Sequence, residues 1–272
     1  MIGSKTGKIL GYKWRSKSCR ICQKAEHEGK IVRNHTCRKN FTGSAKAMEP
    51  DMVEEMVTDS IEKGAKITAI FGDEDTTTIA RLRAKVDPRI KKLSDSNHIK
   101  KPFSSSLYDL RKKHSCLSQK VINYLIKCFN YLIAKGKGKP EEIKQNLDAL
   151  SKHPFGDHSD CNVKKYRKNP ENLANLGSTQ SNESFNKSVA AKAPKNRFYG
   201  GSESLGYRIA AAVAQKNEGH QYTVDVNVST GLSPGIYTQK LATLRDLQAR
   251  KRRAVATTKA AKLRRITLKS NR

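Results

Sequence analysis

The segment Lys66-Ile-Thr-Ala-Ile-Phe-Gly-Asp73 is the clearest indication of fold class in the sequence. It is apolar, rich in β-branched residues and preceded by Gly64, a pattern typical of a buried strand. Apolar residues at helical spacing predict a helix on each side of it, over residues 51–64 and about 76–86, and a second short strand is expected over about 89–94. A strand, a helix and a strand in this order indicate an α/β layout.

The rest of the chain has helical periodicity. From about residue 104 to 152 an apolar stripe recurs at helical spacing, and a turn at Gly136–Gly138 divides it before Pro140, which suits a helix start. The stripe consists of Leu117, Val121, Leu125, Phe129 and Leu132. Two further helices are expected over about 179–191 and 203–216. These elements predict an α/β domain with an inserted, all-helical subdomain.

The net charge points to a polyanionic partner. The 272 residues include 54 Lys and Arg against 25 Asp and Glu, a formal charge of +29. Nucleic acid is the first candidate for the partner, and an anionic membrane surface is the runner-up. No apolar run is long enough to span a bilayer, and no signal peptide is recognisable. We therefore expect an intracellular protein with reduced cysteines, which favours metal over disulfides where cysteines cluster.

One cysteine cluster has the spacing of a zinc site. Cys19-x₂-Cys22 and His35-x-Cys37 supply four soft or borderline ligands within about twenty residues, and a structural zinc ion prefers four such ligands. The stretch around them is poor in apolar residues, so that it would not easily order itself without a metal. The alternative is a set of reduced thiols without a metal.

A second, weaker cluster consists of His153, His158 and Cys161. No fourth ligand is evident, although Asp157 or Asp160 could substitute, and a polar turn between two helices is an equal alternative to a second zinc site. The remaining cysteines, Cys116 and Cys128, are expected in the core of the helical block.

Two acids stand at positions where a metal site could form. Asp73 ends the apolar strand, where open α/β sheets place functional groups, and Glu183 lies on a helix much later in the chain. Carboxylates are the ligands that Mg²⁺ or Mn²⁺ prefers, and such ions promote phosphodiester chemistry. From the residues alone, Asp73 as a helix cap and Glu183 as a surface acid remain the simpler interpretation.

The order of short motifs along residues 5–235 resembles the Mutator-like transposase domain of animal DNA transposons. The motifs are Cys19-x-x-Cys22, His35-Thr-Cys37, Gly72-Asp73-Glu74-Asp75, Asp95-x-x-His98, His153-Pro-Phe-Gly-Asp-His158-x-x-Cys161, Thr179-Gln-x-Asn182-Glu183 and Ala193-Pro194-Lys195. The resemblance implies an RNase H-like mixed sheet and an Asp-Asp-Glu catalytic triad. It makes Asp73, with Asp75 as the close alternative, the second acid and Glu183 the third. It makes Asp95 and His98 supports of the active site.

The first acid of that triad has no counterpart here. Residues 1–25 contain neither Asp nor Glu, so the matching aspartate would fall before Met1, and the first strand or strands of the fold would be missing. We therefore expect an N-terminally truncated, catalytically incomplete transposase fragment. The alternatives are an intact nuclease in which Asp75 or Asp95 fills the gap, and a non-enzymatic, zinc-stabilised nucleic-acid-binding protein derived from a transposase.

The end of the chain is strongly basic. Arg250, Lys251, Arg252 and Arg253 are expected to bind DNA and to serve as a nuclear localisation signal, the alternative being a solvated tail. From about residue 239 we expect a helix that orders on DNA, or disorder. We expect DNA as the partner, homo-oligomerisation as an option, and no membrane. The expected domains are 1–15 (a strand after a turn at Gly7), 16–50 (zinc-binding insert), 51–103 (core with the second acid), 104–175 (helical insertion), 176–238 (core helices with the third acid) and 239–272 (basic tail).

Overall fold

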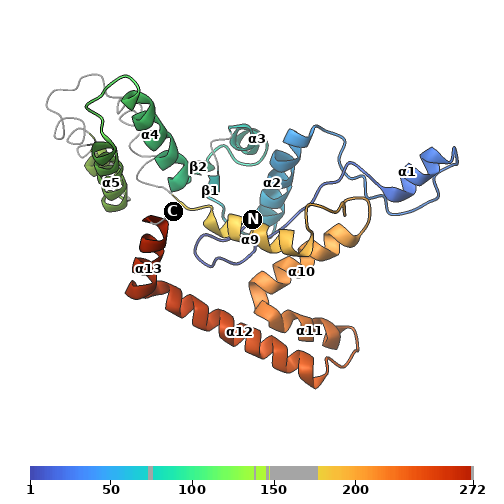
Figure 1. Cartoon of the computed structure of the whole chain (residues 1–272). Helices are drawn as coiled ribbons and strands as arrows, with labels where there is room; N and C mark the ends of the chain where they lie inside the picture. The colour runs from blue at the N-terminus through green and yellow to red at the C-terminus, as the bar shows by residue number, and fades with distance from the viewer. Residues whose placement is uncertain (73–75, 138, 145–146, 148–176, 271–272) are drawn as a thin grey trace. The chain divides into compact units, whose positions relative to one another are not determined.

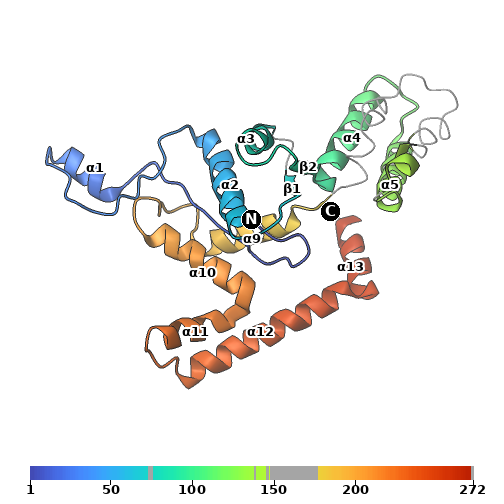
Figure 2. The ribbon, with the colours of Figure 1, turned by 180° about the vertical axis from the view of Figure 1, so that it is seen from behind.

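The computed structural model describes residues 1–72, 76–137, 139–144, 147 and 177–270. The chain divides into two compact units. Met1–Thr42 and Ser184–Arg272 form unit 1, and Gly43–Glu183 form unit 2. Figures 1 and 2 label the helices and strands along the chain. The fold is mixed α/β, mostly helical, with a two-stranded parallel sheet among the described residues. The α/β prediction is therefore confirmed, although the sheet described is small.

Unit 2 begins with the predicted alternation of helices and strands. Its elements are α2 (Ala45–Glu62), β1 (Ala69–Gly72), α3 (Thr77–Lys85) and β2 (Lys91–Ser94). Helix α2 starts before residue 51 because the Ser44 hydroxyl accepts a hydrogen bond from the backbone N–H of Ala47 and caps the helix. The strands are parallel, with Ala69 opposite Lys91 and Gly72 opposite Ser94. Both predicted strands are confirmed, and their carboxyl ends lie at one edge of the sheet.

Helices α2 and α3 are joined by a half-buried group of charges. Arg81 on α3 forms ion pairs with Asp51, at 2.8 Å, and with Glu54 on α2, and Lys85 lies 3.2 Å from Glu54. Burial opposes ionisation of the Glu54 carboxyl, but the hydrogen bonds from Arg81 and Lys85 outweigh it, so the pKa of Glu54 is lowered.

This ion-pair group predicts an acid-dependent loss of stability. A carboxyl with a lowered pKa stabilises the folded state above its ordinary pKa of 4.5, and this contribution disappears as the pH falls through the folded-state value. Replacing Glu54 with Gln is expected to reduce the free energy of unfolding by about 1 kcal/mol at pH 7 and by less near pH 3. Urea unfolding across that pH range measures the difference. The exposed Glu62→Gln serves as control, and an equal loss at both pH values would contradict the prediction.

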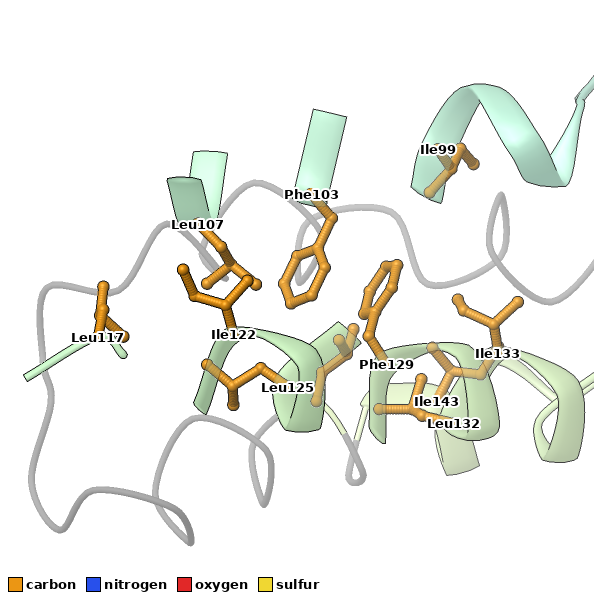
Figure 3. Packing of buried hydrophobic residues seen from close by; sticks show 11 residues of the cluster. Ile99, Phe103, Leu107, Leu117, Ile122, Leu125, Phe129, Leu132, Ile133 and Ile143 are labelled. Carbon is orange, nitrogen blue, oxygen red and sulfur yellow. The ribbon is translucent and has the colours of Figure 1, made fainter. Parts of the chain in front are cut away.

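The helical subdomain of unit 2 has its own hydrophobic core. It contains α4 (Ser96–Arg111) and α5 (Gln119–Lys135), and residues 140–144 are also helical. Phe103 of α4 stacks on Phe129 of α5 with ring centroids 4.0 Å apart (Figure 3). The buried cluster consists of Ile99, Phe103, Leu107, Leu117, Ile122, Leu125, Phe129, Leu132, Ile133, Ile143 and Leu147. The predicted apolar stripe is confirmed, with Val121 only partly buried at its margin.

Two expectations for single segments were wrong. Cys116 is exposed in the turn between α4 and α5 instead of lying in the core, whereas Cys128 is half-buried on α5. Residues 5–15 contain no continuous strand. A tight turn at Gly7, with φ of +65°, brings Ile9 back to Ile2 in an isolated antiparallel bridge.

An asparagine side chain takes the place of a strand neighbour for this N-terminal turn. Asn217, on helix α10 (Ser204–Glu218), accepts from the backbone N–H of Ile9 at 2.8 Å and donates to its carbonyl at 3.0 Å. Because both backbone groups of the buried Ile9 are satisfied by one amide, the segment is held without a sheet.

The regular elements of unit 1 are helices. It contains α1 (Arg20–His27), most of α9 (Gln180–Lys192), α10, the 3₁₀ turn η1 (Gly219–Gln221), α11 (Tyr222–Ser229), α12 (Ile236–Thr257) and α13 (Lys259–Ser270). Asp246 of α12 accepts from the backbone N–H groups of His220, at 2.7 Å, and Gln221, at 3.2 Å, which ties α12 to η1. The basic end of the chain is thus described as two helices. Among the described helices, none has an apolar stretch that would cross a bilayer.

A candidate metal centre and a candidate acidic site

Four side chains from the predicted zinc insert come together in unit 1. Cys19 lies directly before α1 and is buried, and Cys22 lies one turn later on the same helix. His35 and Cys37 come from the loop that follows. The four candidate ligand atoms all lie within 4.8 Å of one another. The structure therefore brings together the ligand set predicted from spacing.

The distances fit a tetrahedral metal ion. His35 Nε2 lies 3.2 Å from Cys19 Sγ and 3.5 Å from Cys22 Sγ, and the Sγ atoms of Cys22 and Cys37 are 3.6 Å apart. Tetrahedral zinc with sulfur and nitrogen ligands holds them about 3.5–3.8 Å apart. His35 Nδ1 lies 2.8 Å from the carbonyl oxygen of Arg33, a partner that orients the ring and leaves Nε2 for the metal. These four residues could hold a metal ion, and zinc suits them.

The pKa values of the Cys19 and Cys22 thiols are shifted in opposite directions. Burial raises the pKa of Cys19, but hydrogen bonds from backbone N–H groups and from His35 lower it to about 6. The hydrogen bond with Cys37, burial and the neighbouring Cys19 raise the pKa of Cys22 to about 11. The surroundings thus stabilise the thiolate of Cys19 and disfavour that of Cys22, and a divalent cation at the centre would stabilise both thiolates.

Backbone contacts hold the metal loop in unit 1. The backbone N–H of Ser16 donates to Asn40 Oδ1 at 2.7 Å, which closes the loop at its two ends. The Ser16 hydroxyl donates to the carbonyl of Gly200 at 2.6 Å, and the backbone N–H of Arg20 donates to that of Gly201 at 3.0 Å. Arg38, next to Cys37, forms an ion pair with Glu203. These anchors could not be predicted from the sequence, because small polar residues are common in loops.

The second candidate site lies at the carboxyl edge of the sheet in unit 2. Asp73 follows Gly72 in the sequence and Asp95 follows Ser94, and Gly72 and Ser94 are opposite each other in the two strands. Asp73 and its alternative Asp75 lie outside the described residues. Asp95 is described and is fully buried.

Asp95 joins the end of β2 to the start of α9. Its Oδ2 accepts a hydrogen bond from the hydroxyl of Thr179 at 2.5 Å. The backbone N–H of Gly177 donates to the Ser94 carbonyl at 3.1 Å, so residues 177–179 run beside the strand end. Glu183, whose backbone N–H donates to the Thr179 carbonyl at 3.0 Å, is exposed on the first turn of α9. Thr179 is thus a site residue whose role the sequence did not reveal.

The structure describes the positions of some of the other predicted site residues. His98 is half-buried near the start of α4, one turn after Asp95. Arg250, Lys251, Arg252 and Arg253 are exposed towards the end of α12. The second Cys/His cluster, His153, His158 and Cys161, lies outside the described residues.

Gly177 is required by the close packing of this edge. A Cβ atom at this position would lie 1.9 Å from the ring of Phe71 in β1. Gly177→Ala is therefore expected to push residues 177–179 away from the sheet and to reduce the free energy of unfolding by about 1–3 kcal/mol. Gly72→Ala, in the same sheet and with nothing within 4 Å of the new atom, is the control. Urea unfolding that ranked the two variants equally would contradict the packing described here.

Comparisons with known proteins agree with the motifs in one respect. The family profile described as Mutator-like transposase matches residues 1–166, more than half of the 272-residue chain. The matched stretch includes the Cys/His metal centre and both strands. The comparison with curated proteins and that with solved structures found no match.

Proposed function

Since the chain belongs to the Mutator-like transposase family, we propose that it binds DNA. We also propose that it carries part of an RNase H-like divalent-metal site formed by Asp73 and Glu183. The observation that supports the site is the hydrogen bond between Asp95 and Thr179, because it holds the first turn of α9 beside the carboxyl end of β2. Thr179 thereby links Asp95 to Glu183, which lies more than eighty positions later in the sequence.

The residues have distinct roles in this proposal. Asp73, or Asp75 in the alternative register, and Glu183 supply carboxylate oxygens to Mg²⁺ or Mn²⁺. When bound, these ions activate the attacking water or 3′-hydroxyl and stabilise the leaving oxygen of a phosphodiester. Glu183 lies in the first turn of α9 and is exposed, so its carboxylate is accessible to a metal ion. Asp95 is buried and accepts from Thr179, so it supports the site together with His98 and is not itself a ligand.

Cleavage by this chain is proposed to be weak. Residues 1–25 contain neither Asp nor Glu, so this stretch supplies no third carboxylate beside Asp73 and Glu183. Loss of one carboxylate from a two-metal site removes much of the charge that binds the second ion. Binding of DNA, which depends on cations, is retained.

The basic helix α12 is the proposed contact to DNA. Arg250, Lys251, Arg252 and Arg253 are all exposed on it, and the chain as a whole carries +29. Such a surface binds phosphates with little sequence preference. The same four cations are proposed as a nuclear localisation signal.

A second candidate function has one specific observation in its favour. The Cys/His centre in unit 1 has a full set of four ligands, whereas the described part of the acidic site shows Glu183 and the buried Asp95. A zinc-stabilised nucleic-acid-binding protein without catalysis would need only the former. It predicts tight polyanion binding, no cleavage with any divalent ion, and loss of folding on zinc chelation.

The salt dependence of DNA binding tests the first part of the proposal. Replacing Arg250, Lys251, Arg252 and Arg253 with alanine is expected to reduce the steepness of the slope of log K against log salt by about 2 to 4, since each phosphate contact contributes about 0.9 and two to four of these side chains contact phosphates. Fluorescence anisotropy with a duplex at several salt concentrations measures the slope. The control variant removes the same charge from exposed positions of unit 2, at Lys113, Lys120, Lys127 and Lys135. Equal changes in both variants would refute a specific role for α12.

A nicking assay tests the acidic site. Supercoiled plasmid is incubated with the zinc-loaded chain and Mn²⁺, and the wild type is compared with Glu183→Gln. Under the proposal, any nicking is weak and disappears in this variant. Nicking that survives the substitution would show that the cleavage does not come from this site, and strong Glu183-dependent nicking would show that the site is complete in this chain.

A further inference from the structure

The basic end of unit 1 is a bent pair of helices with a defined joint. Thr258 has an extended backbone between α12 and α13, with φ of −66° and ψ of 151°, and its hydroxyl accepts from the backbone N–H of Ala261 at 3.3 Å. Arg265 then donates to the carbonyls of Ala256, at 2.7 Å, and Ala261, at 3.2 Å. The capping threonine and the arginine fix the bend, so the two helices present one concave surface.

A pocket of about 560 Å³ lies in this bend. It is lined by Gln248, Lys251, Arg252, Val255, Ala256, Ala261, Arg264, Arg265 and Leu268. Four of these residues are aliphatic and four are cationic. No Asp or Glu follows Asp246 in the printed sequence, so the second half of α12 and all of α13 carry basic side chains without acidic ones.

An exposed apolar face of α12 leads into the pocket. Tyr237, Leu241 and Leu244 are 87%, 48% and 52% exposed. They are four and three residues apart, and the same alternation continues through Gln248 and Lys251 to Val255, which places the whole series on one face of the helix. The other side of α12 packs on η1 through Asp246 and the buried Ala242. The exposed face and the pocket together are called the α12–α13 groove.

The chemistry of the groove selects its occupant. DNA would satisfy the cations, but its phosphates would leave the apolar side chains without a partner. A second copy of the chain would bring the same cations against them, in a protein that already carries +29. An amphipathic helix with acidic flanks satisfies both features, because its apolar residues fill the groove and its carboxylates face Lys251, Arg252, Arg264 and Arg265. We propose that the α12–α13 groove binds an acidic amphipathic helix of a partner protein.

This surface is compatible with DNA binding by the same helix. Arg250 and Arg253 do not line the pocket, and helical geometry turns them to another face of α12 than Lys251 and Val255. The four consecutive basic residues are thereby divided into two that line the groove and two that stay available to phosphates.

A peptide of designed sequence tests the proposal. The probe is a labelled peptide of three heptads with Leu at the a and d positions and Glu at the e and g positions, and anisotropy is measured with the full-length, zinc-loaded chain. Val255→Asp and Leu268→Asp are each expected to weaken binding by about tenfold or more. Both positions are exposed, at 52% and 56%, so the fold should tolerate the change. Leu263→Asp is the matched control, since Leu263 is 54% exposed on α13, receives the same charge and does not line the pocket.

Three results would overturn the proposal. The first is that a scrambled peptide of equal composition binds as well as the helical peptide, and the second is that Leu263→Asp weakens peptide binding as much as Val255→Asp and Leu268→Asp do. The third is sedimentation that shows self-association of the chain through Val255 and Leu268. A loss of duplex DNA affinity in Val255→Asp and Leu268→Asp that exceeds the loss of peptide affinity would assign the groove to DNA. Arg250→Ala/Arg253→Ala is expected to weaken DNA binding and to leave peptide binding unchanged, so the groove and the proposed DNA-binding function can fail separately.

Discussion

We expect the four-ligand centre to bind zinc in solution, and a Cys19→Ser variant to bind it at least about a hundredfold more weakly. Cys19 is the buried member of the four-ligand centre, and its thiolate is the one that the backbone N–H groups already stabilise. A serine hydroxyl is a poor ligand for zinc in comparison with a thiolate. Metal analysis after gel filtration should therefore fall from about one zinc per chain to well below that value.

The same substitution is expected to disorder the metal loop. Residues 26–34 are all exposed, and Ile31 is 98% exposed, so no apolar core holds this segment. Hydrogen exchange over residues 19–40 should become fast in Cys19→Ser. Cys116→Ser is the matched control, since Cys116 is an exposed cysteine outside the centre. If both variants kept their zinc, or lost it equally, the centre assigned here would be wrong.

The second large effect is expected at the buried carboxylate of unit 2. Asp95→Ala should reduce the free energy of unfolding by about 2–4 kcal/mol, because it removes a fully buried hydrogen-bonding group and leaves the Thr179 hydroxyl without its acceptor. It should also loosen the first turn of α9, so the backbone amide of Glu183 should exchange with solvent faster. Urea unfolding and hydrogen exchange measure the two effects. Asp109→Ala, at an exposed ion pair with Lys112, is the control, with an expected change within about 0.5 kcal/mol.

Variants of the threonine separate the hydrogen bond from packing. Thr179→Val keeps the shape and removes the hydroxyl, and Thr179→Ser keeps the hydroxyl. We expect hydrogen exchange at the backbone amide of Glu183 to be faster in Thr179→Val than in the wild type, and to have the wild-type rate in Thr179→Ser. The double variant Asp95→Ala/Thr179→Val should be about 1–2 kcal/mol less destabilised than the sum of the single variants. Strict additivity would show that the two side chains do not act as a pair.

Local patterns in the sequence predicted those elements whose stability is local. The strand around Ile70 and the helix of Phe129 follow from apolar spacing, because one buried face suffices to fix each of them. The four metal ligands could also be predicted, since their spacing reflects the geometry of a single ion. In both cases the deciding residues lie within about twenty positions of one another.

Features that depend on distant residues could not be predicted in this way. Residues 5–15 have the composition of a strand, but both backbone groups of Ile9 pair with the side chain of Asn217, some two hundred positions away. Thr179 donates its hydrogen bond to Asp95, 84 positions away in the sequence, so no local pattern marks it as a site residue. Cys116 was expected inside on the strength of cysteine's usual burial, yet it falls in the turn between two helices.

In the proposed function the carboxylates of Asp73 and Glu183 share one metal site, and Mn²⁺ binding monitored by electron paramagnetic resonance can show whether they do. The zinc-loaded chain, Asp73→Asn, Glu183→Gln and the double variant are titrated with Mn²⁺, with Asp225→Asn as a control at an exposed acid of unit 1. We predict that both single variants lose the same Mg²⁺-competitive Mn²⁺ site, that the double variant loses no more, and that Asp225→Asn retains it. Two independent losses that add in the double variant, or Mn²⁺ binding that neither substitution affects, would contradict the claim.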